Sequence, residues 1–143
     1  MKVIKNQKGF TLMELLVVIA IIAIMSTVVY VALDPVKRFA DARDARRWSD
    51  VNSISTAIHE YVVDNDGSLP SPLTTSYTKA EIGSCGTCAN LATPLVTYLK
   101  SMPLDPASGT SATNTGYYVT VNAQNMVTVS ADNAENTTIE VSR

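Results

Sequence analysis

Residues 8–33 read KGFTLMELLVVIAIIAIMSTVVYVAL, a basic lead-in that passes at once into a long apolar run. From Leu15 to Leu33 no residue is charged. These nineteen residues would span about 28 Å as a helix, close to the hydrocarbon thickness of a bilayer. The sequence therefore predicts a membrane-spanning helix near the N-terminus and argues against a purely cytosolic enzyme.

The polar leader at residues 1–9 carries three lysines and no acidic residue. A secretory signal peptide also starts with basic residues, but its apolar region covers roughly 7–15 residues and ends at small ones. Here the apolar run continues through Tyr30 to Ala32 and Leu33. We therefore expect the helix to stay on the protein rather than to be removed by ordinary signal peptidase.

One carboxylate, Glu14, stands immediately before the uncharged run. An acidic side chain at the centre of a membrane helix costs on the order of 2.5–3.5 kcal/mol, and such residues tend to mark function. The simpler interpretation is that Glu14 lies at headgroup level and stays hydrated. The physics of the residue alone leaves both interpretations open.

The string KGFTLMEL at residues 8–15, with the apolar helix behind it, resembles the class III signal of type IV prepilins and type II secretion pseudopilins. In that family a membrane peptidase cuts after the glycine, methylates the new N-terminal phenylalanine and leaves the helix on the protein. The resemblance implies cleavage between Gly9 and Phe10 and N-methylation of Phe10. It also implies that Glu14 of one subunit neutralises the Phe10 amine of a neighbour and so sets the axial offset in a filament.

The chain after the apolar run has the pattern of an amphipathic helix. Apolar residues recur there at steps of three and four, which predicts a helix lying on a small domain; they are Trp48, Val51, Ile54, Ile58, Tyr61 and Val62. Pro35 is expected to begin or kink this helix. Three charge pairs are spaced i,i+4 along it: Asp34/Arg38, Lys37/Asp41 and Arg46/Asp50.

The family resemblance implies an α+β pilin fold, in which a long N-terminal helix packs on a small antiparallel β-sheet. We divide the chain into a leader (1–9), a transmembrane or filament-core helix (10–33), an amphipathic half of the long helix (34–66) and a globular head (67–143). Within the head we expect a loop at 67–90 and a short helix starting at Thr93–Pro94. Alternating apolar residues predict a meander of three strands at 117–121, 126–131 and 138–141.

The charge distribution does not favour nucleic acid as a partner. The net charge of −2 divides into +3 for residues 1–50 and −5 for residues 51–143. The basic residues that follow the apolar run are interleaved with acids, which makes a DNA-contacting face the weaker alternative. The positive-inside rule does not orient the helix, because three lysines precede it and five basic residues follow. A cytoplasmic N-terminus is implied by the resemblance alone.

Cys85 and Cys88 form a Cys-x-x-Cys pair. Such a pair is able to be redox-active, to supply half of a zinc site, or to form a short disulfide that holds a loop. Zinc would need two more ligands, and His59 is the only histidine. In an oxidising compartment we favour the disulfide, with a membrane-anchored redox protein as a remote alternative.

The remaining candidates are weaker. Relatives of the secretion type often bind calcium in a C-terminal acidic loop, and the comparable cluster here is Asp132, Asn133 and Glu135, short of the six to eight oxygens that calcium takes. No cofactor is therefore expected, with calcium as the exception to test. Residues 136–138 fit a glycosylation sequon, a pattern common by chance. His59 is interpreted as an ordinary helix residue, and no set of catalytic residues converges, so we expect no enzyme.

The resemblance implies a structural subunit of a bacterial type IV pilus, with a type II secretion pseudopilin or a competence pseudopilus subunit as alternatives. Its expected partners are identical subunits, the prepilin peptidase and N-methyltransferase, an assembly platform with its ATPase motor, and the membrane before assembly. The precursor is expected to cross the inner membrane once. The mature form is expected in an extracellular or periplasmic filament.

Overall fold

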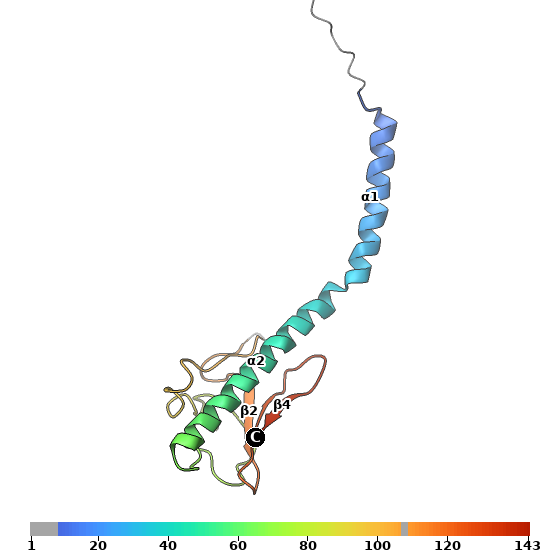
Figure 1. Ribbon diagram of the computed structural model, residues 1–143. Helices are drawn as coiled ribbons and strands as arrows, with labels where there is room; N and C mark the ends of the chain where they lie inside the picture. The colour runs from blue at the N-terminus through green and yellow to red at the C-terminus, as the bar shows by residue number, and fades with distance from the viewer. Residues whose placement is uncertain (1–8, 107–108) are drawn as a thin grey trace, which may run out of the picture. The chain divides into compact units, whose positions relative to one another are not determined.

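The computed structural model describes residues 9–106 and 109–143 (Figure 1). Its contacts divide the chain into one unit up to Arg38 and another from Phe39 to Arg143. The fold is α+β: a long N-terminal helical segment, whose second part packs on a four-stranded antiparallel sheet. The leader lies outside the described residues except for Gly9.

Helix α1 runs from Leu12 to Leu33. Thr11 is its N-cap, with the extended backbone typical of that position (φ −78°, ψ 152°). The helix ends at Asp34, whose left-handed backbone (φ 39°, ψ 72°) cannot continue an α-helix. None of its residues is buried.

Helix α2 runs from Pro35 to Asp64. Proline suits this first helical position because its missing N–H would have no partner there. The Lys37 N–H donates to Asp34 Oδ1 at 3.3 Å, which satisfies another free donor of the first turn. After the helix, the N–H of Gly67 (φ 85°) donates to the Val62 carbonyl at 2.8 Å, a glycine C-terminal closure.

The sheet contains four strands in the order β1-β2-β3-β4, with every neighbouring pair antiparallel. Strand β1 covers Ala80–Glu81, β2 Tyr117–Val121, β3 Val127–Ala131 and β4 Ile139–Ser142. In β2 and β3, buried and half-buried residues alternate, as expected for strands with one face on a core. The meander predicted from the sequence is confirmed within a residue at each strand end, and β1 is an addition.

The core lies between α2 and the sheet. On the helix, Val51, Ile54, Ala57 and Ile58 have at most 2% of their surface exposed, and they belong to the same buried cluster as Val119 and Val129. Each fully buried side chain of this size stabilises the fold by roughly 1.5–3 kcal/mol. The sheet and the second helix therefore form one packed unit.

The segment after Thr93 differs from the sequence prediction. Between Leu91 and Leu99 the structure has consecutive turns, with the N–H of Leu95 donating to Leu91 and that of Leu99 to Leu95, but no regular helix. Leu95 of this segment is nevertheless buried, and Tyr98, Leu99 and Met102 pack on the core. Only a few residues lie between Pro94 and Pro103, too few to propagate a helix.

Candidate functional site: the N-terminal segment and α1

The start of α1 is closed by a reciprocal capping arrangement. The Glu14 N–H donates to Thr11 Oγ1 at 3.2 Å, while Glu14 Oε2 accepts from the Thr11 N–H at 2.8 Å and from its hydroxyl at 2.9 Å. A capping box of this kind satisfies two of the free donors at a helix N-terminus. Glu14 therefore has a local role that the sequence analysis did not identify, although Thr-x-x-Glu is a recognised signal for it.

The side chain of Glu14 is exposed, and so are those of Gly9 and Phe10. Phe10, with 92% of its surface accessible, and Gly9 precede the helix in non-helical backbone. The peptide bond between Gly9 and Phe10 thus lies outside regular structure. Such a bond is able to enter a peptidase site without the loss of helical hydrogen bonds.

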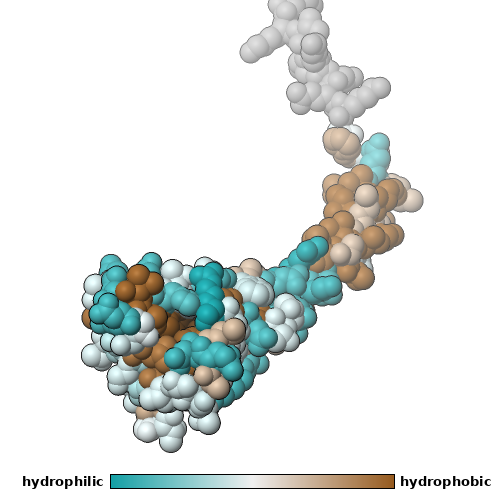
Figure 2. Space-filling model, turned by 60° about the horizontal axis from the view of Figure 1, so that its bottom comes forward, coloured by the Kyte–Doolittle hydropathy of each residue, from teal (hydrophilic) through white to brown (hydrophobic). Residues whose placement is uncertain are grey.

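The surface of α1 is apolar on every side. Its large hydrophobic residues are all exposed, from Leu12 to Leu33, and α1 is long and apolar enough to cross a membrane. In Figure 2 the helix is coloured almost entirely as hydrophobic. A helix apolar all round needs either lipid or other helices around it.

The hydroxyls of Ser26 and Thr27, inside α1, do not interrupt this surface. Ser26 Oγ donates to the Ile22 carbonyl at 2.7 Å, and Thr27 Oγ1 to the Ala23 carbonyl at 3.0 Å. Both hydroxyls are therefore paired within the helix. Neither would bring an unsatisfied donor into an apolar environment.

The prokaryotic N-terminal methylation motif matches residues 4–30, which contain Gly9, Phe10, Glu14 and most of α1. The chain carries the class III signal of type IV pilins and pseudopilins. The N-terminal methylation motif marks the chain as a precursor of that kind, and with the apolar helix it supports anchoring of the precursor in a membrane. No curated protein and no solved structure matches the chain.

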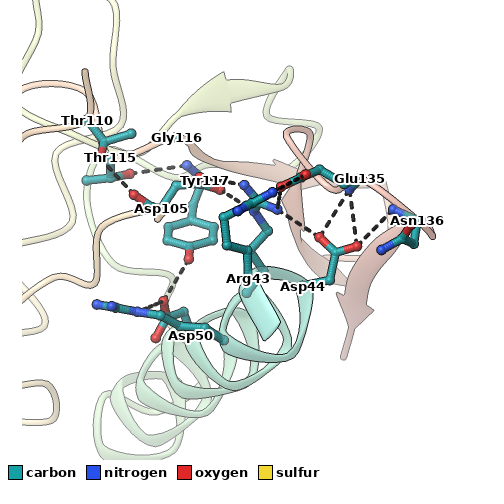
Figure 3. Close-up of polar contacts among 12 residues, drawn as sticks. Arg43, Asp44, Asp50, Asp105, Thr110, Thr115, Gly116, Tyr117, Glu135 and Asn136 are labelled. Atoms are coloured by element: carbon teal, nitrogen blue, oxygen red, sulfur yellow. Dashed lines mark hydrogen bonds and ion pairs between the residues drawn. The ribbon is translucent and has the colours of Figure 1, made fainter. Parts of the chain in front are cut away.

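A second polar cluster joins α2 to the head. Arg47, 1% exposed, donates from Nε and Nη2 to the two carboxylate oxygens of Asp105 at 2.8 and 3.0 Å, and from Nη1 to Asp44 at 2.8 Å and Glu135 at 3.1 Å. Arg43 donates to both oxygens of Glu135 at 2.6 and 2.5 Å (Figure 3). We call Arg43, Asp44, Arg47, Asp105 and Glu135 the ion-pair cluster.

The cluster perturbs the ionisation of its members. Hydrogen bonds from Arg43, and then from Arg47, lower the pKa of Glu135 to about 2. Burial of Asp44 acts to raise its pKa, but hydrogen bonds from Arg47 and from the backbone of Asn136 and Glu135 outweigh it, and the net shift is downward. These acids are held charged by their donors, which is the pattern of a structural network.

The residues proposed for calcium already have cationic partners in this structure. Asp132 pairs with Lys79 at 2.5 Å, and Glu135 belongs to the ion-pair cluster. Across residues 9–106 and 109–143, no group of three or more His, Cys, Asp or Glu side chains is arranged to hold a metal ion. The expectation that the protein has no cofactor, with calcium as the exception to test, stays a prediction.

Cys85 and Cys88 form a disulfide. Its loop is also held by backbone hydrogen bonds from Ser84 to Ala112 and from Cys85 to Thr113, both 3.2 Å. His59 lies half-buried on α2, and its Nε2 has no hydrogen-bond partner in the part of the chain that the structure describes. Asn136, the residue of the sequon, donates from its side chain to Asp41 at 3.0 Å.

Proposed function

We propose that this protein is the structural subunit of a type IV pilus filament, cut after Gly9, N-methylated at Phe10 and polymerised through α1. The observation that carries the proposal is the methylation motif, which includes most of a helix with no buried residue. Such a helix is stable in lipid as a monomer and in a bundle of identical helices as a polymer. The proposal needs no reaction catalysed by the subunit itself.

Glu14 supplies the specificity of assembly in this proposal. Cleavage creates a positive amine on Phe10, and the carboxylate of Glu14 on a neighbouring subunit neutralises it. At an effective dielectric near 20 and a separation of about 4 Å, the pair gains about 4 kcal/mol before desolvation is subtracted. An unpaired Glu14 inside a helical bundle would be costly, so one axial offset between neighbours is favoured.

The partners follow from this cycle. The precursor sits in the inner membrane with its N-terminus in the cytoplasm, where a prepilin peptidase cuts and methylates it. An assembly platform with an ATPase motor then moves the subunit into the filament. We favour a surface pilus over a secretion pseudopilus because Asp132 and Glu135, the acids compared with a calcium loop, pair instead with lysine and arginine.

Intact-mass and N-terminal analysis of material sheared from the surface of the native host tests the proposal. The expected species is residues 10–143 with one methyl group on Phe10, recovered with high-molecular-weight filaments. A Gly9→Leu variant, which places a bulky residue at the cut, is the control and should stay uncut in the membrane. Wild-type protein that retains residues 1–9 and never leaves the membrane would contradict the proposal. Processed filaments confined to the periplasm would contradict the surface location.

A further inference from the structure

The charges at the two ends of α2 oppose the helix's own dipole. Its first turn has no acidic residue but contains Lys37 and Arg38, and its last turn has no basic residue but contains Asp64, with Glu60 one residue before that turn. Cations are unfavourable at a helix N-terminus and anions at a C-terminus. The C-terminal end of α2 is therefore poorly compensated within one chain, whereas at the N-terminal end the Asp34 carboxylate accepts from the Lys37 N–H at 3.3 Å.

The N-terminal end also exposes apolar side chains. Val36 is 76% and Phe39 66% exposed, and they flank Lys37 and Arg38. Among the described residues, the ion pairs include neither of these two basic side chains. We call residues 36–39 the basic segment. It combines two uncovered apolar groups with two cations that belong to none of these ion pairs.

The C-terminal end of α2 has a hollow of complementary character, the acidic groove, formed by Thr56, His59, Glu60, Val63, Asp64 and Tyr98. Its volume is about 330 Å³, and a second hollow of about 440 Å³ continues it along the helix, sharing Thr56, Glu60 and Tyr98. Val63 is 78% exposed. The groove thus offers apolar contact from Val63 and the Tyr98 ring, beside the carboxylates of Glu60 and Asp64.

Resting on the proposed filament, we propose that the basic segment of one copy docks in the acidic groove of a second copy. Lys37 and Arg38 then lie beside Glu60 and Asp64, while Val36 and Phe39 cover Val63 and Tyr98. The contact places two cations beside the carboxylates at the C-terminal end of α2, where the helix itself has no basic residue. Segment and groove lie at opposite ends of one helix, so a chain does not fill its own groove.

The contact is heterologous, because the two surfaces that meet are different. Heterologous contacts generate open assemblies when the rotation between copies does not close into a ring. The charge complementarity therefore suits a filament rather than a closed dimer. It adds a second contact between subunits, independent of α1.

Charge reversal tests the docking in full-length protein expressed in the native host. K37E/R38E and E60K/D64K should each lower the yield of sheared filaments at least tenfold, and the variant carrying all four changes should restore it. The control is Lys100→Glu, on an exposed residue outside both surfaces, with a filament yield equal to wild type. Loss without restoration would overturn the docking, as would detachment of K37E/R38E from the membrane, which would assign the basic segment to lipid headgroups.

Cross-linking provides the second measurement. A chain carrying both Phe39→Cys and Val63→Cys should give, on oxidation of filaments, a ladder of covalent oligomers. Filaments of each single-cysteine variant should give no ladder. Filaments that contain both single-cysteine variants should give covalent dimers only, because each chain then carries one introduced cysteine. Filaments of the double-cysteine chain that give no 39–63 cross-link would overturn the docking and leave the filament proposal intact, whereas absence of filaments from the wild-type chain would contradict the filament proposal itself.

Discussion

Arg47 and Asp105, which are 58 residues apart in the sequence, form a buried bidentate ion pair. The Nε–Oδ2 and Nη2–Oδ1 distances are 2.8 and 3.0 Å. The pair fixes α2 to the segment that leads into β2. Because the Arg47 guanidinium also bonds Asp44 and Glu135, all of its hydrogen-bonding nitrogens are engaged by carboxylates. Burial of this charge is tolerated only because the partners are in place.

Replacing Arg47 by Met should therefore destabilise the head by about 3–5 kcal/mol, since it leaves carboxylates buried without a cation. The measurement is denaturant unfolding of the full chain in detergent, followed by circular dichroism. Arg46→Ala is the control. The Arg46 side chain is 63% exposed, and its ion pair with Asp50 is long, at 3.7 Å, so this pair should contribute little to stability. We expect the control to lower the free energy of unfolding by about 0–1 kcal/mol. Equal losses in both variants would contradict the role of the buried pair.

The folding stability of the protein should fall in acid, because protonation of Glu135 removes its charge. Its folded pKa of about 2 lies below the ordinary value of 4.5, because Arg43 and Arg47 stabilise the carboxylate. A lowered folded pKa contributes stability that is complete above about pH 4.5 and is lost as the pH falls toward 2. Melting temperatures of wild type and Glu135→Gln across this window measure the effect. The difference between them should shrink as the pH falls, and a difference independent of pH would contradict the assignment.

The phenol of Tyr117 should titrate late. Burial, and then its hydrogen bond to Asp50 Oδ2 at 2.7 Å, raise the pKa of the phenol. A raised folded pKa means that the contribution to stability is complete below about pH 10 and is lost above it. Ultraviolet titration should show a late phase that loses the contribution of this phenol in Tyr117→Phe. An unchanged late phase in Tyr117→Phe would contradict the assignment of the raised pKa to Tyr117.

Two glycines of the disulfide region offer a matched comparison. A Cβ at Gly83 would lie 2.1 Å from the Thr113 carbonyl oxygen, which is backbone, whereas a Cβ at Gly86 meets nothing within 4 Å. Gly83→Ala should cost about 1–3 kcal/mol of unfolding free energy, as overpacking does. Gly86→Ala should be nearly neutral, and the same unfolding experiment compares the two. A neutral Gly83→Ala would show that the loop at 111–114 is free to move away.

The sequence predicted those parts of the fold that have a strong local period. The uncharged run from Leu15 to Leu33 and the alternation at 117–121 and 127–131 each specify an element without help from distant residues. Strand β1 has only two residues, too few for a pattern, and is held by pairing with β2. Its position within the loop predicted at 67–90 therefore depended on tertiary contacts.

The ion-pair cluster was missed for a related reason. Among the three predicted i,i+4 pairs, Arg46–Asp50 is present at 3.7 Å, but the stronger contacts of Arg47 are to residues far along the chain. A signal was nevertheless available, because Arg47 lies four residues before Val51 and thus on the buried face of the helix. A basic residue on the buried face of a helix predicts a buried acidic partner, but the sequence does not identify that partner.

Glu14 has two separable roles, as the capping residue of α1 and as the charge proposed to meet Phe10, and three variants distinguish them. Glu14→Gln keeps a capping box but removes the charge, Glu14→Ala removes both, and Thr11→Ala removes the cap but keeps the charge. Because the register depends on the charge, Glu14→Gln and Glu14→Ala should insert normally and lose most filaments. Thr11→Ala should insert and assemble, with helix stability lower by about 0.5–2 kcal/mol.

The measurement is filament yield in the sheared fraction, normalised to the processed protein in the membrane. Normalisation matters because a variant that is cut poorly would also give few filaments, and the mass of the membrane form shows whether Phe10 is the first residue. Normal filaments from Glu14→Gln would eliminate the charge as the register device. Loss of filaments in Thr11→Ala at unchanged processing would instead assign assembly to the capped helix start, since the carboxylate is still present in that variant.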